Sequence, residues 1–295
     1  MTLEQLRIFV AVAEHEHVTR AAAELNMSQS AVSAAVAALE GRHATRLFDR
    51  VGRRIALTRD GQAFLVEARA VLARAAEAET VLADLAGLKR GSLSIAASQT
   101  VGNYWLPPIL AAYRTGHPGV AVSLAIGNTT TVSAMVRDGA VDVGFVEDVV
   151  DDPALAVVPV AADDLVLVVP PDLSPNRAPA AAALAGLPWV FREPGSGTRA
   201  IAEAALRALG LDVHRLDVVL DLPSNEAVRS AVEGGAGAAV LSSLVVAGAL
   251  QAGTLVALDL PLPARQFASI RHRERHATRA ERALHDLIAR RSRAG

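Results

Sequence analysis

The sequence of 295 residues contains no cysteine, which excludes disulfide bonds, thiolate metal sites and thiol-based redox sensing. Lysine occurs once, at Lys89, so basic function rests on arginine. No run of 18 apolar residues occurs, and we expect no membrane-spanning helix and no membrane partner. Glu4 and Arg7 interrupt the first residues, and we expect no signal peptide. A cytoplasmic protein is compatible with all of these absences and is the location we expect.

Negative charge slightly exceeds positive charge overall, but positive charge is concentrated in one stretch. The formal net charge is −2, whereas residues 42–59 hold six arginines and one aspartate, a local charge of +5. These arginines are Arg42, Arg46, Arg50, Arg53, Arg54 and Arg59. Contact with nucleic-acid phosphates needs a local basic patch of this kind. Taken alone, the stretch is equally compatible with a solvated arginine face.

Two short helices with a tight break at Asn26-Met27 are predicted for residues 19–39. We expect Thr19 to cap the first helix and Ser28 the second, because their hydroxyls accept from otherwise unpaired backbone N–H groups. Small residues at 21–23 allow the helices to cross closely. This pattern, preceded by a helix at residues 3–14, is typical of a helix-turn-helix, whose second helix enters the DNA major groove.

The second of these helices, expected from Ser28 to Glu40 with Gly41 just after its end, has two different faces. Its apolar side chains lie on one arc, at Val32, Val36 and Leu39. Its small and polar side chains lie on the exposed first turn and the opposite face, and we assign Gln29, Ser30 and Ser33 to the surface that reads DNA bases. Residues 47–50 and 54–57 predict a hairpin, or wing. We expect its arginines Arg50, Arg53 and Arg54 to contact phosphate or enter the minor groove.

A long helix is predicted from residue 60 to residue 88, where the sequence is rich in Ala, Glu, Leu and Arg and lacks proline. Its apolar side chains form an imperfect heptad stripe interrupted by Glu79; they are Leu65, Ala68, Leu72, Ala75, Leu82 and Leu85. We expect this stripe to pair with a second subunit. Packing against its own chain is the alternative.

Beyond residue 90, strands alternate with helices, which predicts parallel α/β sheets. We expect strands at residues 93–97, 120–126, 141–146, 165–169, 189–191, 218–220, 238–241 and 266–270. We expect helices at residues 103–115, 130–138, 178–185, 199–209, 225–233 and 278–290.

Polar segments follow the carboxyl ends of several of these strands, at residues 98–100, 128–130, 194–199 and 224–225, and each precedes a helix. Ligands of open α/β sheets collect at that edge, where helix N-termini favour anions. Each segment alone is better explained as an ordinary helix cap. Their recurrence predicts a cleft for a small anion or a carboxylate-bearing metabolite.

Enzyme chemistry finds little support in the sequence. Gly195-Ser196-Gly197 is neither a Walker A loop nor a nucleophile elbow. No histidine has an evident catalytic partner, and no metal-ligand spacing of Cys and His occurs. We therefore expect neither an enzyme nor a metal or other cofactor. An α/β enzyme with an accessory N-terminal domain, and a solute-binding protein, are the rival interpretations.

With these residues the chain resembles the LysR-type transcriptional regulators over nearly its full length. The most specific segments are residues 19–39, 47–50 and 57–61. The resemblance implies a mixed fold of α and α/β parts. A winged helix-turn-helix at residues 1–59 and a dimerising linker helix at 60–90 precede a two-lobed effector domain at 91–295 that is like a periplasmic binding protein. Lobe I would hold about 91–162 and 266–295, and lobe II about 163–265.

Three further segments, residues 97–107, 127–129 and 192–199, together with 224–228, are similar to the branch that holds regulators of cysteine and sulfur metabolism, sulfite response and carbon fixation. The resemblance implies an effector such as a sulfur oxyanion or a phosphorylated or carboxylated metabolite. The effector-site candidates it implies are Ser98, Thr100, Asn128, Thr129, Ser196, Gly197 and Thr198. Further candidates for the cleft lining are Gln99, Glu147, Arg192 and Glu226, and Glu147 is equally compatible with a solvated loop position.

The expected partners are double-stranded DNA, a small anionic or carboxylate effector, further copies of the chain in a homodimer or homotetramer, and RNA polymerase. A regulator that needs no effector is an open alternative. The sequence departs from the family at His43-Ala44, where members usually carry a leucine-glycine pair.

Overall fold

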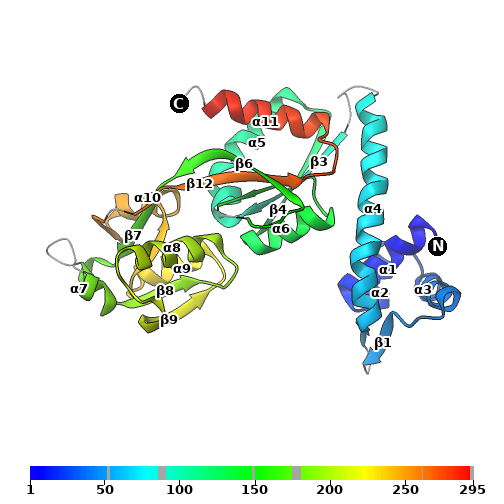
Figure 1. Cartoon of the computed structure of the whole chain (residues 1–295), viewed down its shortest axis with the longest axis horizontal. Coiled ribbons are helices and arrows are strands. Elements are labelled where there is room, and N and C mark those ends of the chain that lie inside the picture. The colour runs from blue at the N-terminus through cyan, green and yellow to red at the C-terminus, as the bar shows by residue number, and fades with distance from the viewer. Residues whose placement is uncertain (52–53, 86–90, 148–149, 175–180, 261, 293–295) are drawn as a thin grey trace. The chain divides into compact units, whose positions relative to one another are not determined.

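The computed structural model describes residues 1–51, 54–85, 91–147, 150–174, 181–260 and 262–292, and its elements are drawn in Figure 1. The chain forms two compact units, the first with residues 1–85 and the second with nearly all of the rest. Among the described residues, no helix is both long enough and apolar enough to cross a membrane.

Three helices open the first unit: α1 (Leu3–His15), α2 (Val18–Glu24) and α3 (Gln29–His43). Ser28 caps α3 as expected, because its hydroxyl accepts from the backbone N–H of Ala31. The predicted cap at Thr19 is wrong. The N-cap residue of α2 is His17, whose side chain makes no capping hydrogen bond, and Thr19 lies inside the helix.

The end of α3 also differs from the prediction. Gly41 does not end the helix, which continues to His43 and is terminated by Ala44 in the left-handed conformation with a φ of 48°. The predicted tight break before α3 is confirmed, since Asn26 adopts a φ of 54°. A short polar side chain such as that of Asn tolerates this conformation better than most residues do.

The predicted wing is present as β1 (Phe48–Val51) and β2 (Arg54–Leu57), which pair antiparallel from Phe48 opposite Leu57 to Val51 opposite Arg54. Its tip at residues 52–53, which includes Arg53, lies outside the described residues. The carboxylate of Glu40 fastens the wing to α3 by accepting from the backbone N–H groups of Leu47 and Phe48, at 2.7 and 3.1 Å.

Helix α4 (Arg59–Leu85) follows the wing. Its first half packs on its own chain: Ala68 is buried in a cluster with Leu6 and Phe9 of α1, and Leu65 and Leu72 pack against that cluster. The alternative of intrachain packing therefore holds for this half of the predicted stripe. Farther along, Leu82 is 68% exposed, and Val66 and Val71 also expose large apolar side chains.

The second unit begins with a five-stranded sheet in the order β4-β3-β5-β12-β6. Its strands are β3 (Gly91–Ser98), β4 (Val120–Gly127), β5 (Val143–Val146), β6 (Leu155–Asp163) and β12 (Arg265–His272). Strand β3 pairs parallel with β4 and β5, whereas β12 pairs antiparallel with β5 and β6. The predicted parallel pairing holds for β3, β4 and β5, whereas β12 runs against its neighbours and β6 was not predicted.

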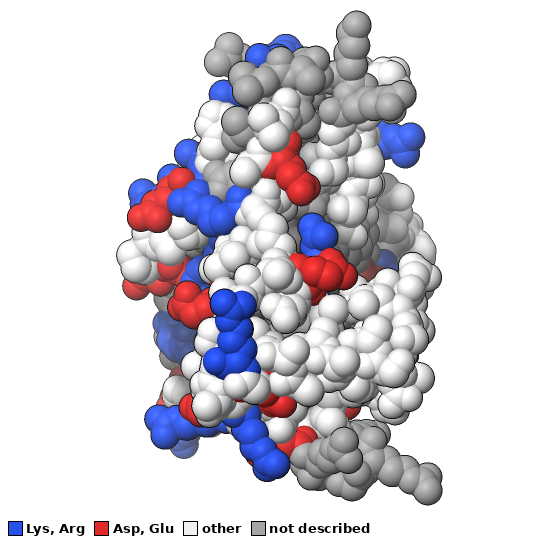
Figure 2. Space-filling model, turned by 90° about the vertical axis from the view of Figure 1, so that its right-hand side faces the viewer, with Lys and Arg blue, Asp and Glu red and all other residues white. Residues whose placement is uncertain are grey.

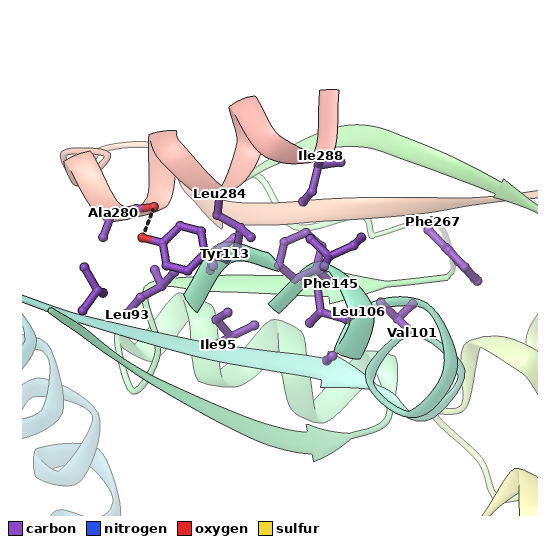
Figure 3. Packing of buried hydrophobic residues seen from close by; sticks show 14 residues of the cluster. Leu93, Ile95, Val101, Leu106, Tyr113, Phe145, Phe267, Ala280, Leu284 and Ile288 are labelled. Carbon is purple, nitrogen blue, oxygen red and sulfur yellow. Dashed lines mark hydrogen bonds between the residues drawn. The ribbon is translucent and has the colours of Figure 1, made fainter. Parts of the chain in front are cut away.

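Helices cover both faces of this sheet (Figure 1). Helices α5 (Pro107–Gly116) and α11 (Arg279–Ser292) lie on one face, and α6 (Thr129–Asp138) lies on the other. Figure 3 shows the first of these cores, where the hydroxyl of Tyr113 donates to the carbonyl of Ala280 at 3.0 Å. This bond joins α5 to α11 across the buried layer. We call this sheet with its helices lobe I.

The predicted helix at residues 103–115 is divided in two. A short π-helix, η1 (Val101–Trp105), comes first, and its last turn closes through a bond from the N–H of Leu106 to the carbonyl of Val101. Pro107 and Pro108 then occupy the first two positions of α5. Proline lacks a backbone N–H and fits only the first turn of a helix, which explains why α5 begins there.

Lobe II contains the remaining elements. Strands β7 (Leu165–Val169), β10 (Ala239–Ser242) and β11 (Val256–Leu258) form an antiparallel sheet, and β8 (Pro188–Arg192) pairs parallel with β9 (Asp217–Leu222). The helices are α7 (Ala181–Ala185), α8 (Gly197–Ala208), α9 (Asn225–Glu233) and α10 (Ser243–Ala252), with short 3-10 turns at Pro171–Leu173 and Val213–Arg215. Strand β11 and helix α10 were not predicted. The two lobes are joined through the end of β6 and the start of β12.

Gly61 is required where α4 begins. A Cβ at this position would lie 2.1 Å from the carbonyl oxygen of Leu47. We predict that Gly61→Ala destabilises the chain by about 1–3 kcal/mol, measured by urea unfolding followed by circular dichroism. Gly41→Ala is the matched control, because Gly41 lies inside α3 with open space around it. It should stabilise by about 1 kcal/mol, and equal losses in both variants would contradict the steric explanation.

Candidate functional site

The predicted DNA-reading surface lies on the exposed side of α3. Gln29, Ser30 and Ser33 are all exposed, whereas Val32 and Leu39 on the same helix are fully buried against the rest of the unit. Helix α3 therefore presents small polar side chains outward while its apolar side holds it in place. Thr19 is exposed on α2. Arg50 stands in β1 and Arg54 in β2 of the wing.

Charged side chains of both signs are interspersed with uncharged ones over the face shown in Figure 2. On that view the described residues form no block of a single charge. The sequence concentrates positive charge locally, with six arginines against one aspartate in residues 42–59, which is the kind of field that DNA binding needs.

The cleft candidates gather where β3, β4 and β5 end at their carboxyl edge. Ser98 ends β3 opposite Gly127 of β4. Asn128 follows β4 and caps α6, because its side-chain oxygen accepts from the backbone N–H of Thr131 at 2.9 Å. Thr129 is the first residue of α6 and is buried.

Lobe II supplies the opposite side of the cleft from the start of α8. The hydroxyl of Ser196 caps α8 by accepting from the backbone N–H of Arg199, and Gly197 and Thr198 form the first turn. All three are buried. Thr130 of α6 donates from its backbone to the carbonyl of Gly195 at 3.4 Å, which brings the two helix starts together.

The two lobes meet at the guanidinium of Arg265, the first residue of β12, whose side chain is 2% exposed. Its Nε donates to Oδ2 of Asp163 at 2.6 Å. Its Nη2 donates to Thr100 Oγ1 in lobe I and its Nη1 to Thr198 Oγ1 in lobe II, both at 3.2 Å. Ser242 completes the pairing of Asp163 by donating to Oδ1 at 2.8 Å. One buried cation thus bonds to both lobes and to the strand that connects them.

Glu147, directly after β5, is buried rather than solvated, with 2% of its surface exposed. Its Oε1 accepts from the hydroxyls of Thr198 and Thr100, at 3.2 and 3.4 Å, and lies 3.9 Å from Nη1 of Arg265. Burial raises the pKa of Glu147, and the charge of Arg265 and the bond from Thr198 oppose this rise. The alternative of a solvated loop residue is excluded for this position.

Arg192 is also buried and is held by acceptors on several sides. Its Nη1 donates to Oδ1 of Asn225 at 2.6 Å, and its Nε and Nη2 donate to the two carboxylate oxygens of Glu193 at 2.8 and 3.0 Å. Asn225 in turn donates to Thr100 Oγ1 at 3.0 Å, and Asn128 donates to Glu193 at 3.1 Å. The charge of Arg192 is therefore already paired.

Gln99 and Glu226 also hold the lobes together rather than standing open in the cleft. Gln99 donates to the carbonyl of Pro223 at 2.8 Å and accepts from the backbone N–H of Asn225 at 2.9 Å. Glu226 accepts from Tyr104 and Asn103 of lobe I at 3.0 and 3.2 Å. These bonds join lobe I to the start of α9.

An open pocket of about 600 Å³ adjoins this region and is lined by Thr129 and Ser196 of the candidate set, with Arg137 and Arg199 among its other residues. Arg199 is paired with Glu203 and Asp221. In the cleft, three buried polar atoms have no hydrogen-bond partner among the described residues: Ser98 Oγ, Thr129 Oγ1 and Glu147 Oε2. No cluster of residues suited to hold a metal ion occurs in the part of the chain that the structure describes.

Sequence reasoning missed Arg265 and Asp163. Arg265 lies 165 residues from Thr100 along the chain, and Asp163 ends a strand that was not predicted. A signal was nevertheless present, since each charged residue adjoins a run of strand-forming residues at a lobe boundary. Residues 224–225 form one of the predicted polar segments, but Asn225 is not among the predicted effector-site residues.

Comparisons with known proteins identify both units. A family model described as bacterial regulatory helix-turn-helix protein, lysR family, matches residues 3–62. A second, described as LysR substrate binding domain, matches residues 86–293. Together they define a DNA-binding transcription regulator with an effector-binding domain, and not an enzyme. The chain belongs to the LysR family.

The chain matches known transcription regulators over most of their length. The chain is 37% identical over 289 residues to the uncharacterized HTH-type transcriptional regulator YeiE of Escherichia coli K12, with 97% of this chain and 96% of that protein covered. It is 36% identical to the RuBisCO operon transcriptional regulator of Allochromatium vinosum, covering 88% and 85%. The RuBisCO operon regulator fits the expected branch of the family, which includes regulators of carbon fixation.

Solved structures confirm the fold. The crystal structure of full-length CbnR complexed with its target DNA matches 98% of this chain and 99% of that chain, with a TM-score of 0.71 and 23% sequence identity. The winged helix-turn-helix followed by a linker helix and a two-lobed domain is therefore the architecture of this chain, as the sequence predicted.

Arg265 is the residue on which we expect the stability of the second unit to depend. Arg265→Met leaves Asp163 and Glu147 buried without their cation, and we predict a loss of about 3–5 kcal/mol in the free energy of unfolding. Arg207→Met is the matched control, because Arg207 is half exposed and paired with Glu203 one helical turn away. That change should cost less than about 0.5 kcal/mol. Urea unfolding followed by tryptophan fluorescence measures both, and similar losses would contradict the assignment.

Proposed function

We propose that the chain binds a specific DNA sequence through α3 and the wing, and that a small effector held between the two lobes switches its activity. The arrangement of exposed Gln29, Ser30 and Ser33 over a buried apolar face of α3 carries the first half of this proposal. Side chains this small let the helix approach base edges closely. Arg50, Arg53 and Arg54 supply phosphate or minor-groove contacts, and Thr19, which is exposed on α2, is a further DNA-binding residue in this proposal.

The effector site is the cleft built by Ser98, Thr100, Asn128, Thr129, Ser196, Gly197 and Thr198. Buried hydroxyls and two helix starts from opposite lobes support an acidic ligand, because helix N-termini favour negative charge. Glu147, Arg192, Gln99 and Glu226 surround the site and set its electrostatics. The effector acts by favouring one arrangement of the lobes, which requires that it bind the two arrangements with different affinity.

The target genes belong to carbon metabolism in this proposal. Support comes from relatives named as regulators of RuBisCO operons and from CbbR of Rhodospirillum rubrum, to which the chain is 32% identical over 95% of its length. A role in sulfur metabolism rests on the sequence resemblance alone.

Homodimers or homotetramers are the proposed working form. The exposed apolar side chains Val66, Val71 and Leu82 on α4 favour contact with a second copy, since helices bury such residues when they pair. Since the target is genomic DNA, we place the protein in the cytoplasm, with RNA polymerase as a further partner. The proposed domain limits are residues 1–59, 60–90 and 91–295.

Ser33→Arg tests the DNA-reading surface. Because Ser33 is exposed, we predict that folding is unchanged while binding to the promoter region upstream of its own gene is lost, as measured by a mobility shift. Thr115→Arg adds the same charge at an exposed position of α5 and should bind like the original chain. Unchanged binding by the Ser33 variant would refute the assigned surface.

Arg53→Ala tests the wing. We predict weaker binding to every DNA sequence and a slope of log K against log salt reduced by about one unit, because one fewer phosphate counterion is released. Mobility shifts at several salt concentrations measure this slope. A loss confined to the specific site, with the slope unchanged, would indicate base reading instead.

A further inference from the structure

Three polar atoms at one edge of lobe I need partners that the described residues do not supply. Ser98 Oγ, Thr129 Oγ1 and Glu147 Oε2 are buried and make no hydrogen bond, and they follow or end β3, β4 and β5. Buried polar groups are nearly always hydrogen-bonded, so three such atoms at one edge indicate a molecule that bonds to them. Neighbouring strands lie about 4.8 Å apart. The outer two of the three strand ends are therefore separated by about 10 Å.

At the β5 end, Glu147 in its carboxylate form requires a molecule that donates a hydrogen bond. The single protons of the Thr100 and Thr198 hydroxyls already go to Glu147 Oε1. Thr100 also accepts from Arg265 and Asn225, which uses its full capacity. These threonines therefore cannot donate to an anion while Glu147 holds them. The free oxygen of Glu147 accepts, and as a carboxylate it repels a bare oxyanion.

The balance of charge points the same way. The two guanidinium groups closest to Glu147, those of Arg265 and Arg192, are already paired with Asp163 and Glu193, so Glu147 shares Arg265 at 3.9 Å and has no cation of its own. A positively charged donor completes this balance. At the other end, the hydroxyls of Ser98 and Thr129 stand beside the start of α6, a place that suits a carboxylate or a phosphate.

We propose that the effector is a small bifunctional acid, whose ammonium group donates to Glu147 Oε2 and whose carboxylate or phosphate bonds to Ser98 and Thr129. The proposal rests on the proposed function of the cleft and narrows its ligand. An inorganic oxyanion alone does not fill the site, because it offers no donor to Glu147.

Matched acids that differ only in the amine test the ligand class. L-Glutamate is compared with glutarate and L-aspartate with succinate, beside sulfate, phosphate and thiosulfate. Each is titrated into the full chain by calorimetry and thermal unfolding. We expect at least one amino acid to bind, with its amine-free partner about tenfold to a hundredfold weaker, the range for a hydrogen bond to a charged group. The inorganic anions should not stabilise the chain at equal concentration.

Two variants test the assigned atoms. Glu147→Gln should erase the preference for the amine-bearing acid, and Glu233→Gln is its control, since Glu233 pairs with Arg229 and Thr254. Ser98→Ala removes a hydroxyl that bonds to nothing else, so the unfolding temperature should stay within a degree or two or rise slightly. Its affinity for the amino acid should nevertheless fall about tenfold.

The results separate this inference from the proposed function. Tight binding of an inorganic anion or an amine-free acid, unaffected by Glu147→Gln, would overturn the bifunctional ligand and leave the effector cleft standing. Binding of an amino acid that neither Glu147→Gln nor Ser98→Ala weakens would overturn the assigned atoms and hence the inference. If no compound binds, both the inference and the assigned effector cleft fail.

Discussion

The guanidinium of Arg265 holds the second unit in the arrangement observed. It stands at the point where chain from lobe II returns to lobe I, and it pairs with Asp163 at the end of the outgoing strand. Its remaining bonds reach Thr100 in one lobe and Thr198 in the other. A buried ion pair is costly unless its geometry is good and all its other hydrogen-bonding positions are filled. Any movement between the lobes must therefore break bonds to this group.

Local patterns were sufficient for the parts of the fold that short-range forces decide. Helical spacing of apolar residues located α1 and α3, the two runs around residue 52 located the wing, and the Ser28 cap was correct because capping needs only its own turn. Thr19 failed as a cap because α2 begins two residues earlier than predicted, with His17 at its N-cap and Thr19 inside its first turn. Strand β6 was missed because several of its side chains are exposed, which weakens the buried-strand pattern.

The candidate site was predicted in its location and only partly in its chemistry. Polar segments after parallel strands of one sheet meet at one edge by topology, so Ser98 and Thr129 were found without knowing any distance. Thr198 was found in the same way, after β8 of lobe II. The occupation of Thr100 and Thr198 by Glu147 depends on contacts between residues about 50 positions apart. No pattern in the sequence reports such contacts. The hydroxyls of Thr100 and Thr198, which favoured a simple anion, therefore already donate to Glu147. The ligand must donate a hydrogen bond at this end of the site rather than accept one.

The need for a donor at Glu147 also indicates how a ligand distinguishes two arrangements of the lobes. The three unpartnered atoms all belong to lobe I, so contacts to them alone would favour neither arrangement. Closing the lobes removes Glu147 from water, and this burial is the largest of the effects that raise its pKa. The burial of this carboxylate makes closure costly, because desolvation opposes its charged form. An ammonium group beside Glu147 offsets that cost only when the lobes are closed, and this difference in affinity shifts the population.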